Sequence, residues 1–213
     1  MTVIVGHPWS DGPMAELDER GRIEQASRAQ AIAVIAHRGQ KDKLGVDYIY
    51  HPLGVAMRFD PLEDTLECCA AWLHDVLEDT DITADDLELA GIHPEVIEVV
   101  ELLTRRDGEG DEYYWRIAQN DSARAVKIAD IIDNTDPARL GALDEETQDR
   151  LHAKYAHALQ MLDEPWPIHW QIGQIGWSEF GSARLLAGPP EDDEEWEEED
   201  DEADNLDDEG VLR

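Results

Sequence analysis

A histidine and an aspartate stand side by side at positions 74 and 75, inside an apolar run that is typical of a helix. Imidazole and carboxylate groups are common ligands of divalent metal ions. A second acidic pair, Glu78 and Asp79, follows one helical turn later on the same side. Because buried ionisable groups are costly without a partner, this helix is expected to serve binding or catalysis. His74 and Asp75 are candidate metal ligands, and the acidic pair is placed to work beside the ion.

A metal site on this helix needs further ligands from other elements of the chain. The sequence offers Asp130, on a helix that is otherwise apolar, and His51, at the start of another helix. Lys127, Asp130 and Asn134 follow one another at i, i+3 and i+7, so they form one polar stripe. Taken singly, Asp130 is equally compatible with an ion pair to Lys127, and His51 with an ordinary helix start. Taken together, these residues predict one metal centre built from three helices.

The spacing of apolar residues is helical almost throughout residues 22–162, and strand signals are scarce. Asp60 as an N-cap and Pro61 at the first helical position predict a long helix that continues through the histidine–aspartate pair. Further helices are expected before Gly39, from near His51, over 83–90, from Pro94, over 113–119, over 122–136 and around 151–162. The predicted fold class is all-α, an orthogonal helical bundle.

The chain divides by composition into four parts. Residues 1–21 are an N-terminal extension, and residues 22–162 are the predicted helical domain. Residues 163–188 hold three tryptophans among Gly, Pro and Ser without helical spacing, and we expect this segment to pack on or near the domain. Residues 189–213 carry an acidic run with almost nothing apolar to bury, so this tail is expected to be disordered.

The net charge of −34 comes from 51 acidic and 17 basic residues, and 15 of the acidic ones lie within 191–209. Nucleic acid binding requires clustered lysines and arginines, so this composition argues against it. No apolar run approaches the length of a membrane span, and the N-terminus lacks the features of a signal peptide. Cys68 and Cys69 are adjacent and offer no disulfide framework. We expect a cytoplasmic protein, for which a homo-oligomer is left open.

Four motifs, in this order, resemble those of the HD-domain hydrolases of the RelA/SpoT type, in particular the small alarmone hydrolases. The resemblance covers roughly residues 22–160. Its motifs lie at His51–Ala56, Ala70–Thr80, Leu102–Thr104 and Val126–Asn134.

This resemblance implies an all-helical HD fold that holds one divalent ion, usually manganese. Glu78 and Asp79 match the family's acidic pair, which orients or deprotonates the attacking water, and Asn134 matches a residue near the sugar of the bound nucleotide. Enzymes of this family remove pyrophosphate from the 3′ position of guanosine tetra- or pentaphosphate, so the implied partner is an anionic nucleotide. By motif position, the metal ligands would be His51, His74, Asp75 and Asp130.

The loop over residues 40–47 departs from the family pattern. Gln40 stands where the family's base-stacking arginine is expected, and Asp47 replaces the usual proline. Glutamine lacks the planar cation that stacks on a base. Lys41 and Lys43 remain candidate substrate contacts in this loop. Further candidate phosphate contacts are Arg105, Arg106, Lys127 and Arg139.

The sequence therefore predicts a metal-dependent phosphohydrolase that acts on a guanosine alarmone. An HD phosphatase of other nucleoside phosphates is the alternative within the same fold, and it would release orthophosphate rather than pyrophosphate. A non-catalytic nucleotide-binding protein that interacts through its acidic tail is the alternative of another class. A degenerate site is expected to have lost at least one ligand or acid, whereas this chain keeps all of them.

Overall fold

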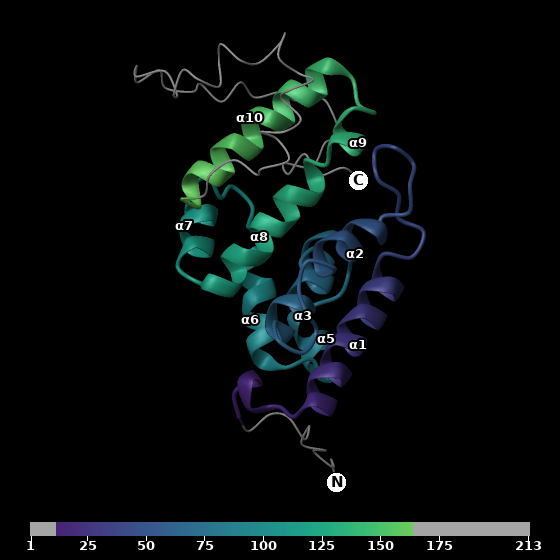
Figure 1. Ribbon diagram of the computed structural model, residues 1–213, viewed down its shortest axis with the longest axis vertical. Helices are drawn as coiled ribbons and strands as arrows, with labels where there is room; N and C mark the ends of the chain where they lie inside the picture. Colours follow the sequence, from purple (N-terminus) through teal and green to yellow (C-terminus); the bar gives the residue numbers. More distant parts are fainter. Residues whose placement is uncertain (1–11, 164–213) are drawn as a thin grey trace. The chain divides into compact units, whose positions relative to one another are not determined.

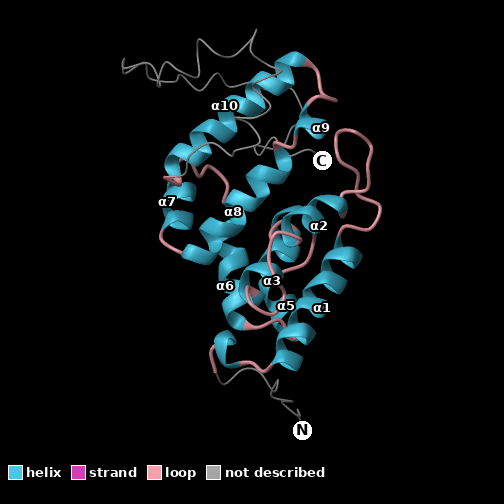
Figure 2. Cartoon of the chain, viewed as in Figure 1, coloured by secondary structure: helices cyan, strands magenta, loops and turns pink. Residues whose placement is uncertain are grey.

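Helices are the regular secondary structure of residues 12–163, the part of the chain that this computed structural model describes (Figures 1 and 2). No strand occurs in these residues, so the predicted all-α fold is confirmed there. The Trp-rich segment after residue 163 and the acidic tail lie outside the described residues. The elements in order are η1 (Met14–Glu16), α1 (Glu19–Ala36), α2 (Tyr50–Ala56), α3 (Thr65–Leu73), α4 (Val76–Asp79), α5 (Ala84–Leu89), α6 (Pro94–Leu103), α7 (Glu112–Ala118), α8 (Asp121–Asn134), α9 (Pro137–Leu140) and α10 (Glu145–Met161).

Local sequence signals explain where several of these helices begin. Thr83 and Asp86 form a reciprocal capping box at the start of α5, in which each side chain accepts a hydrogen bond from the other's backbone N–H. Asn120 caps α8 by accepting a hydrogen bond from Ala123 N, and Pro94 occupies the first turn of α6. Each cap satisfies backbone donors that a helix leaves without a partner.

Helix α3 lies at the centre of the fold and contacts α1, α2, α6 and α8 (Figure 1). All residues from Cys68 to Leu73 are buried, so this helix is enclosed on every side. Cys68 and Cys69 are both free thiols within this core. The central helix ends at Leu73, directly before the histidine–aspartate pair, and so delivers that pair to the middle of the bundle.

The structure corrects the long helix predicted from Asp60 through Asp79. The Asp60 side chain does cap, but it accepts hydrogen bonds from Leu62 N (2.8 Å) and Glu63 N (3.1 Å) within a turn, and α3 begins only at Thr65. Aspartate side chains stabilise such turns in competition with a helix. For this reason the cap signal at Asp60 predicts a helix that begins too early in the chain. The helix is also interrupted at the histidine–aspartate pair. The short helix α9 was not predicted.

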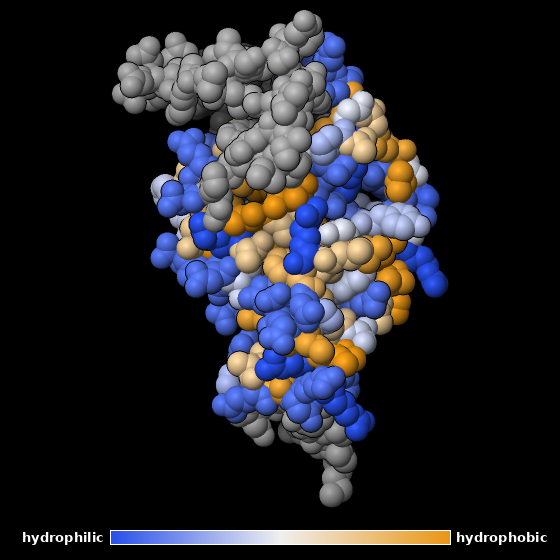
Figure 3. All heavy atoms as spheres, in the orientation of Figure 1, coloured by the Kyte–Doolittle hydropathy of each residue, from blue (hydrophilic) through white to orange (hydrophobic). Residues whose placement is uncertain are grey.

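The surface of the described residues is mixed. Figure 3 shows hydrophilic residues over much of one face, with apolar patches between them. Among the residues described, no helix is long and apolar enough to cross a bilayer. Exposed apolar side chains include Ile23, Ile35 and Met57.

The fully buried Gln25 ties α1 to the loop between α5 and α6. Its Nε2 donates to the carbonyl of Gly91 (3.0 Å), and its Oε1 accepts from the backbone N–H of His93 (3.0 Å). This amide therefore satisfies two backbone groups that burial would otherwise leave without a hydrogen bond.

Replacing Gln25 by Ala should destabilise the fold by about 2–4 kcal/mol, because both backbone groups lose their partner while they stay buried. The measurement is urea unfolding of the two proteins followed by circular dichroism. Gln30→Ala, at an exposed position on the same helix, is the control and should change the midpoint little. Equal midpoints for all three proteins would show that the bridge contributes nothing.

Candidate metal centre

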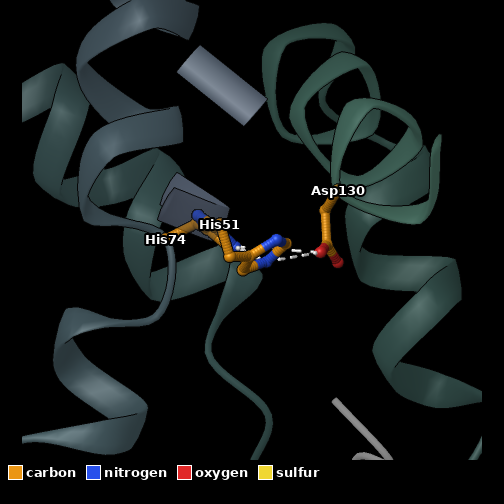
Figure 4. Close-up of side chains that lie close together, drawn as sticks. All are labelled: His51, His74 and Asp130. Atoms are coloured by element: carbon orange, nitrogen blue, oxygen red, sulfur yellow. Dashed lines mark hydrogen bonds and ion pairs between the residues drawn. The ribbon is translucent and has the colours of Figure 1, made fainter. Parts of the chain in front are cut away.

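Two imidazoles and a carboxylate meet in the interior of the bundle. The Nε2 atoms of His51 and His74 lie 3.2 Å apart, and His51 Nε2 lies 3.1 Å from Asp130 Oδ1. One ligand atom from each of these residues falls within 4.8 Å of the others, and all three residues are buried. Figure 4 shows both rings turned toward the Asp130 carboxylate. The three side chains come from α2, from the turn after α3, and from α8.

Outer hydrogen bonds fix which nitrogen of each imidazole faces the centre. His51 Nδ1 lies 2.8 Å from Asp133 Oδ2, and His74 Nδ1 lies 2.7 Å from the carbonyl of Ala71. Both partners are acceptors, so both Nδ1 atoms carry a hydrogen, and in the neutral rings both Nε2 atoms present lone pairs. Two lone pairs this close repel each other unless a proton or a metal ion supplies positive charge beside them. The donor set therefore fits a divalent metal ion.

Asp75 reaches the same place from the neighbouring position. Its Oδ2 lies 3.0 Å from His74 Nε2 and 3.6 Å from His51 Nε2, and it accepts a hydrogen bond from the hydroxyl of Tyr48. Adjacent residues on a regular helix point about 100° apart. Here a turn separates α3 from α4 at this pair, with Asp75 at φ −101° and ψ −3°, and the two side chains converge.

The Asp130 carboxylate is held from its own helix. Lys127 Nζ lies 2.9 Å from Oδ2, and Asn134 Nδ2 donates to Oδ1 at 2.6 Å. The polar stripe predicted on α8 therefore exists, with both flanking residues bonded to the aspartate between them. Asn134 is fully buried, and its amide supports a candidate ligand.

A second layer of charges supports His51. The guanidinium of Arg139 is hydrogen-bonded to Asp133 Oδ2, the same oxygen that His51 Nδ1 contacts. Arg139 also lies 3.7 Å from Asp42 Oδ2, in the loop before α2. Asp42 Oδ1 in turn accepts hydrogen bonds from two backbone N–H groups of that loop, Leu44 and Val46. One arginine thus links the loop to the carboxylate that orients a candidate ligand.

Gly54 makes room for this carboxylate on α2. A Cβ atom added at Gly54 would lie 2.1 Å from Asp133 Oδ1 and 2.9 Å from its Cγ, well inside van der Waals contact. The absence of a side chain at this position is what lets α2 and α8 approach closely enough for Asp133 to reach His51.

Burial and nearby carboxylates oppose each other at the two imidazoles. Burial lowers the pKa of His74, but the charges of Asp75 and Asp130 outweigh it and raise that pKa to about 9. The pKa of His51 is also raised, because hydrogen bonds to Asp130 and Asp133 exceed the effect of burial. The pKa values of Asp75 and Asp130 are lowered, against the effect of burial, by the surrounding cationic groups. The pocket stabilises positive charge.

The acidic pair Glu78 and Asp79 lies on α4, directly after the ligand turn. Glu78 Oε2 accepts a hydrogen bond from the backbone N–H of Arg105 at 3.1 Å, which ties α4 to the end of α6. Both carboxylate oxygens of Asp79 are buried. The pair follows His74 and Asp75 by one helical turn along the chain, and its work beside the ion stays a prediction.

The loop over residues 40–47, which is predicted to contact substrate, is held by an ion pair and a hydrogen bond. Lys41 Nζ forms an ion pair with Asp47 at 2.7 Å, and both side chains are about half exposed (53% and 54%). Gln40 Oε1 lies 2.7 Å from Nδ1 of the buried His37, at the end of α1. Lys43 lies in the same loop and is partly buried. These contacts connect the loop to α1 and across its own two ends.

Sequence reasoning missed Tyr48, Gly54 and Asp133 as parts of the site. Asp133 had a signal, because it lies three residues after Asp130 and therefore on the same face of α8. Tyr48 lies outside any helix and three residues before His51, so periodicity carries no information on where its hydroxyl points. Gly54 lies within α2, and the need for a glycine there becomes apparent only from the close packing of α8 against it.

Comparison with known proteins agrees with this geometry. No family model matches the chain. It is 38% identical over 87 residues to a guanosine-3′,5′-bis(diphosphate) 3′-pyrophosphohydrolase of Vibrio cholerae, covering 40% of this chain and only 12% of that protein. It is 37% identical over 120 residues to the human enzyme of the same name, covering 52% of this chain and 67% of that protein. The chain thus spans a small part of the bacterial relative and two thirds of the human one.

A solved structure shares the fold. The metazoan orthologue of SpoT, described as hydrolysing ppGpp, superposes with a TM-score of 0.55 at 24% identity, covering 65% of this chain and 85% of that chain. A helical bundle in which a histidine–aspartate pair meets a histidine and an aspartate from two other helices defines the HD-domain class. Within this class, the chain belongs to the RelA/SpoT-type hydrolase family.

Replacing Gly54 by Ala should lower the affinity for manganese roughly tenfold, because the methyl group displaces Asp133 and frees the His51 ring. Asp133→Ala should cause a similar loss. The double variant should lose no more than Asp133→Ala alone, since the clash disappears with the carboxylate. Manganese titration by isothermal calorimetry measures all three. Additive losses in the double variant would contradict the proposed clash.

Manganese binding should release protons from chelator-treated protein and should strengthen as pH rises toward about 9. The raised pKa of His74 means that its ring is protonated below that pH, and the ion must displace this proton to reach Nε2. Calorimetry at pH 7 in two buffers of different ionisation enthalpy counts the protons released. Equal apparent enthalpies in both buffers would mean that no proton is displaced.

Proposed function

We propose that this chain is a metal-dependent hydrolase that removes pyrophosphate from the 3′ position of a guanosine alarmone. The observation that carries the proposal is the convergence of two imidazoles and Asp130, beside Asp75, next to the acidic pair on α4. The similarity to 3′-pyrophosphohydrolases of human and Vibrio cholerae origin supports the same reaction. We also propose manganese as the ion and the cytoplasm as the place of action.

Each residue has a distinct part in the proposed reaction. His51, His74, Asp75 and Asp130 would hold the ion. A divalent ion held there lowers the pKa of a water molecule and offsets phosphate charge. Glu78 or Asp79 accepts the proton of the attacking water, since a carboxylate beside the reacting oxygen is a suitable general base. Tyr48 donates a hydrogen bond to Asp75 and so keeps its carboxylate turned toward the centre.

Lys41, Lys43 and Asn134 are the proposed substrate contacts. The two lysines lie in the loop over residues 40–47, which Arg139 connects to the His51 side of the site. A lysine contributes a point charge to a phosphate, without the planar stacking surface of arginine. Asn134 is proposed to lie near the sugar of the nucleotide. It also donates a hydrogen bond to the candidate ligand Asp130.

A second candidate function is favoured by the contacts of the loop. Gln40 is bonded to His37, and Lys41 is paired with Asp47, so the loop presents no planar cation to a guanine base. An HD phosphatase of other nucleoside phosphates would use the same metal chemistry without that stacking contact. A panel of nucleotides, including the guanosine alarmones, incubated with protein and manganese distinguishes the two by product. Pyrophosphate from the alarmones supports the first function, and orthophosphate from other nucleotides supports the second.

Asp75→Ala and Glu78→Gln should separate metal binding from turnover. Asp75→Ala should lose both, because it removes a charged group at the centre of the site. Glu78→Gln should keep manganese but lower kcat by about a hundredfold or more, because it removes a candidate general base. Bound metal is measured by elemental analysis and turnover by release of pyrophosphate.

Glu63→Gln is a matched control, since it makes the same change at an exposed position. It should retain both metal and turnover. A Glu78→Gln enzyme as active as this control would remove Glu78 from the mechanism and leave Asp79 as the base.

A further inference from the structure

Arg105 differs from the other cations near the centre. Lys127 is paired with Asp130, Arg139 with Asp133, and Lys41 with Asp47. The Arg105 guanidinium instead lies over two aromatic rings, with its Cζ 4.8 Å from the centroid of Tyr113 and 5.6 Å from that of Tyr114. No carboxylate among residues 12–163 forms an ion pair with it, although the chain holds three times as many acidic as basic residues.

Two contacts place Arg105 beside the candidate catalytic groups. Its backbone N–H donates to Glu78 Oε2 at 3.1 Å, so the residue is anchored to the acidic pair. The Tyr113 ring that it covers also lies 5.3 Å from Lys127 Nζ, and Lys127 contacts the candidate ligand Asp130. The two cations therefore lie close to the same ring and no more than about 10 Å from each other.

The ring is a fixed support for this cation. Tyr113 is 2% exposed, and its hydroxyl donates to the carbonyl of Leu103 at 2.8 Å. An arginine that stacks on an aromatic ring uses the face of its guanidinium and keeps the N–H groups at its edge available. Arg105 is half-buried, so these donors remain within reach of a ligand from solution. A planar guanidinium binds phosphate oxygens in a bidentate manner.

We propose that Arg105 binds the pyrophosphate group of the substrate beside Glu78, and that this contact selects for ligands with two linked phosphates. The identity of the substrate in this inference rests on the proposed function. The binding of pyrophosphate by Arg105 does not. Arg105 offsets the negative charge that Glu78 and Asp79 would otherwise present to an arriving anion.

Arg150, on α10, supplies a matched control. Its side chain is exposed, and it belongs neither to the candidate metal centre nor to the candidate phosphate contacts. Replacing either arginine by Gln removes the same charge from the protein, so only a specific contact of Arg105 separates the two variants.

The experiment measures binding of inorganic pyrophosphate to manganese-loaded protein by calorimetry, with free manganese held constant by a metal buffer. Arg105→Gln should weaken binding at least about tenfold, and Arg105→Lys should weaken it less, because a charge remains but the fork is lost. Arg150→Gln should bind within about twofold of the parent protein. Manganese affinity and thermal unfolding of each variant, measured in parallel, show that the fold and the metal centre are intact.

The outcomes separate this proposal from the proposed function. Selective loss of pyrophosphate binding in Arg105→Gln supports the contact, even if the parent protein fails to hydrolyse a guanosine alarmone, and in that case only the assigned reaction falls. Equal losses in Arg105→Gln and Arg150→Gln would show that only the overall charge of the protein matters, and would overturn the contact. Absence of pyrophosphate binding by the parent protein would overturn it as well, whatever the enzyme hydrolyses.

Discussion

Two buried imidazoles, those of His51 and His74, need a positive charge between them, and the surrounding structure depends on this need. Nε2 atoms 3.2 Å apart, with carboxylates on both sides, form a stable arrangement only when a proton or a metal ion supplies positive charge between them. Everything nearby serves to hold these groups together. Hydrogen bonds that the rings donate to Asp133 and Ala71 orient them, Tyr48 orients Asp75, and Lys127 and Asn134 hold Asp130. The bundle around α3 brings α2, the turn between α3 and α4, and α8 to this single point.

Much of the fold and the ligand set could be read from the sequence. Proline at the start of α6, glycine after α1 and the apolar spacing of α8 each act locally, so the sequence reveals them without knowledge of the packing. His74 and Asp130 stood out because a polar group in an apolar helix has few structural explanations, and His51 because it offers a further imidazole at the position that the family motif implies. The structure brings those three together, in agreement with that prediction.

The remaining features depend on contacts between elements far apart in the chain. The turn that separates α3 from α4 is invisible to periodicity, because the apolar stripe continues from Leu73 to Leu77. Gly54 is explained only by the Asp133 carboxylate, 79 residues later, and Arg139 only by the two aspartates that it joins. At Asp60 the local signal was correct but its consequence was not. The side chain caps a turn, and α3 begins only at Thr65.

The excess of carboxylates has opposite effects on the two encounters that this protein must make. A negatively charged surface concentrates cations around it and repels polyphosphate anions, and both effects weaken as the Debye length shortens. Added salt therefore slows the arrival of the metal while it speeds the arrival of the nucleotide. The ionic strength that suits both encounters is a compromise, set by the excess of acidic over basic residues in the chain.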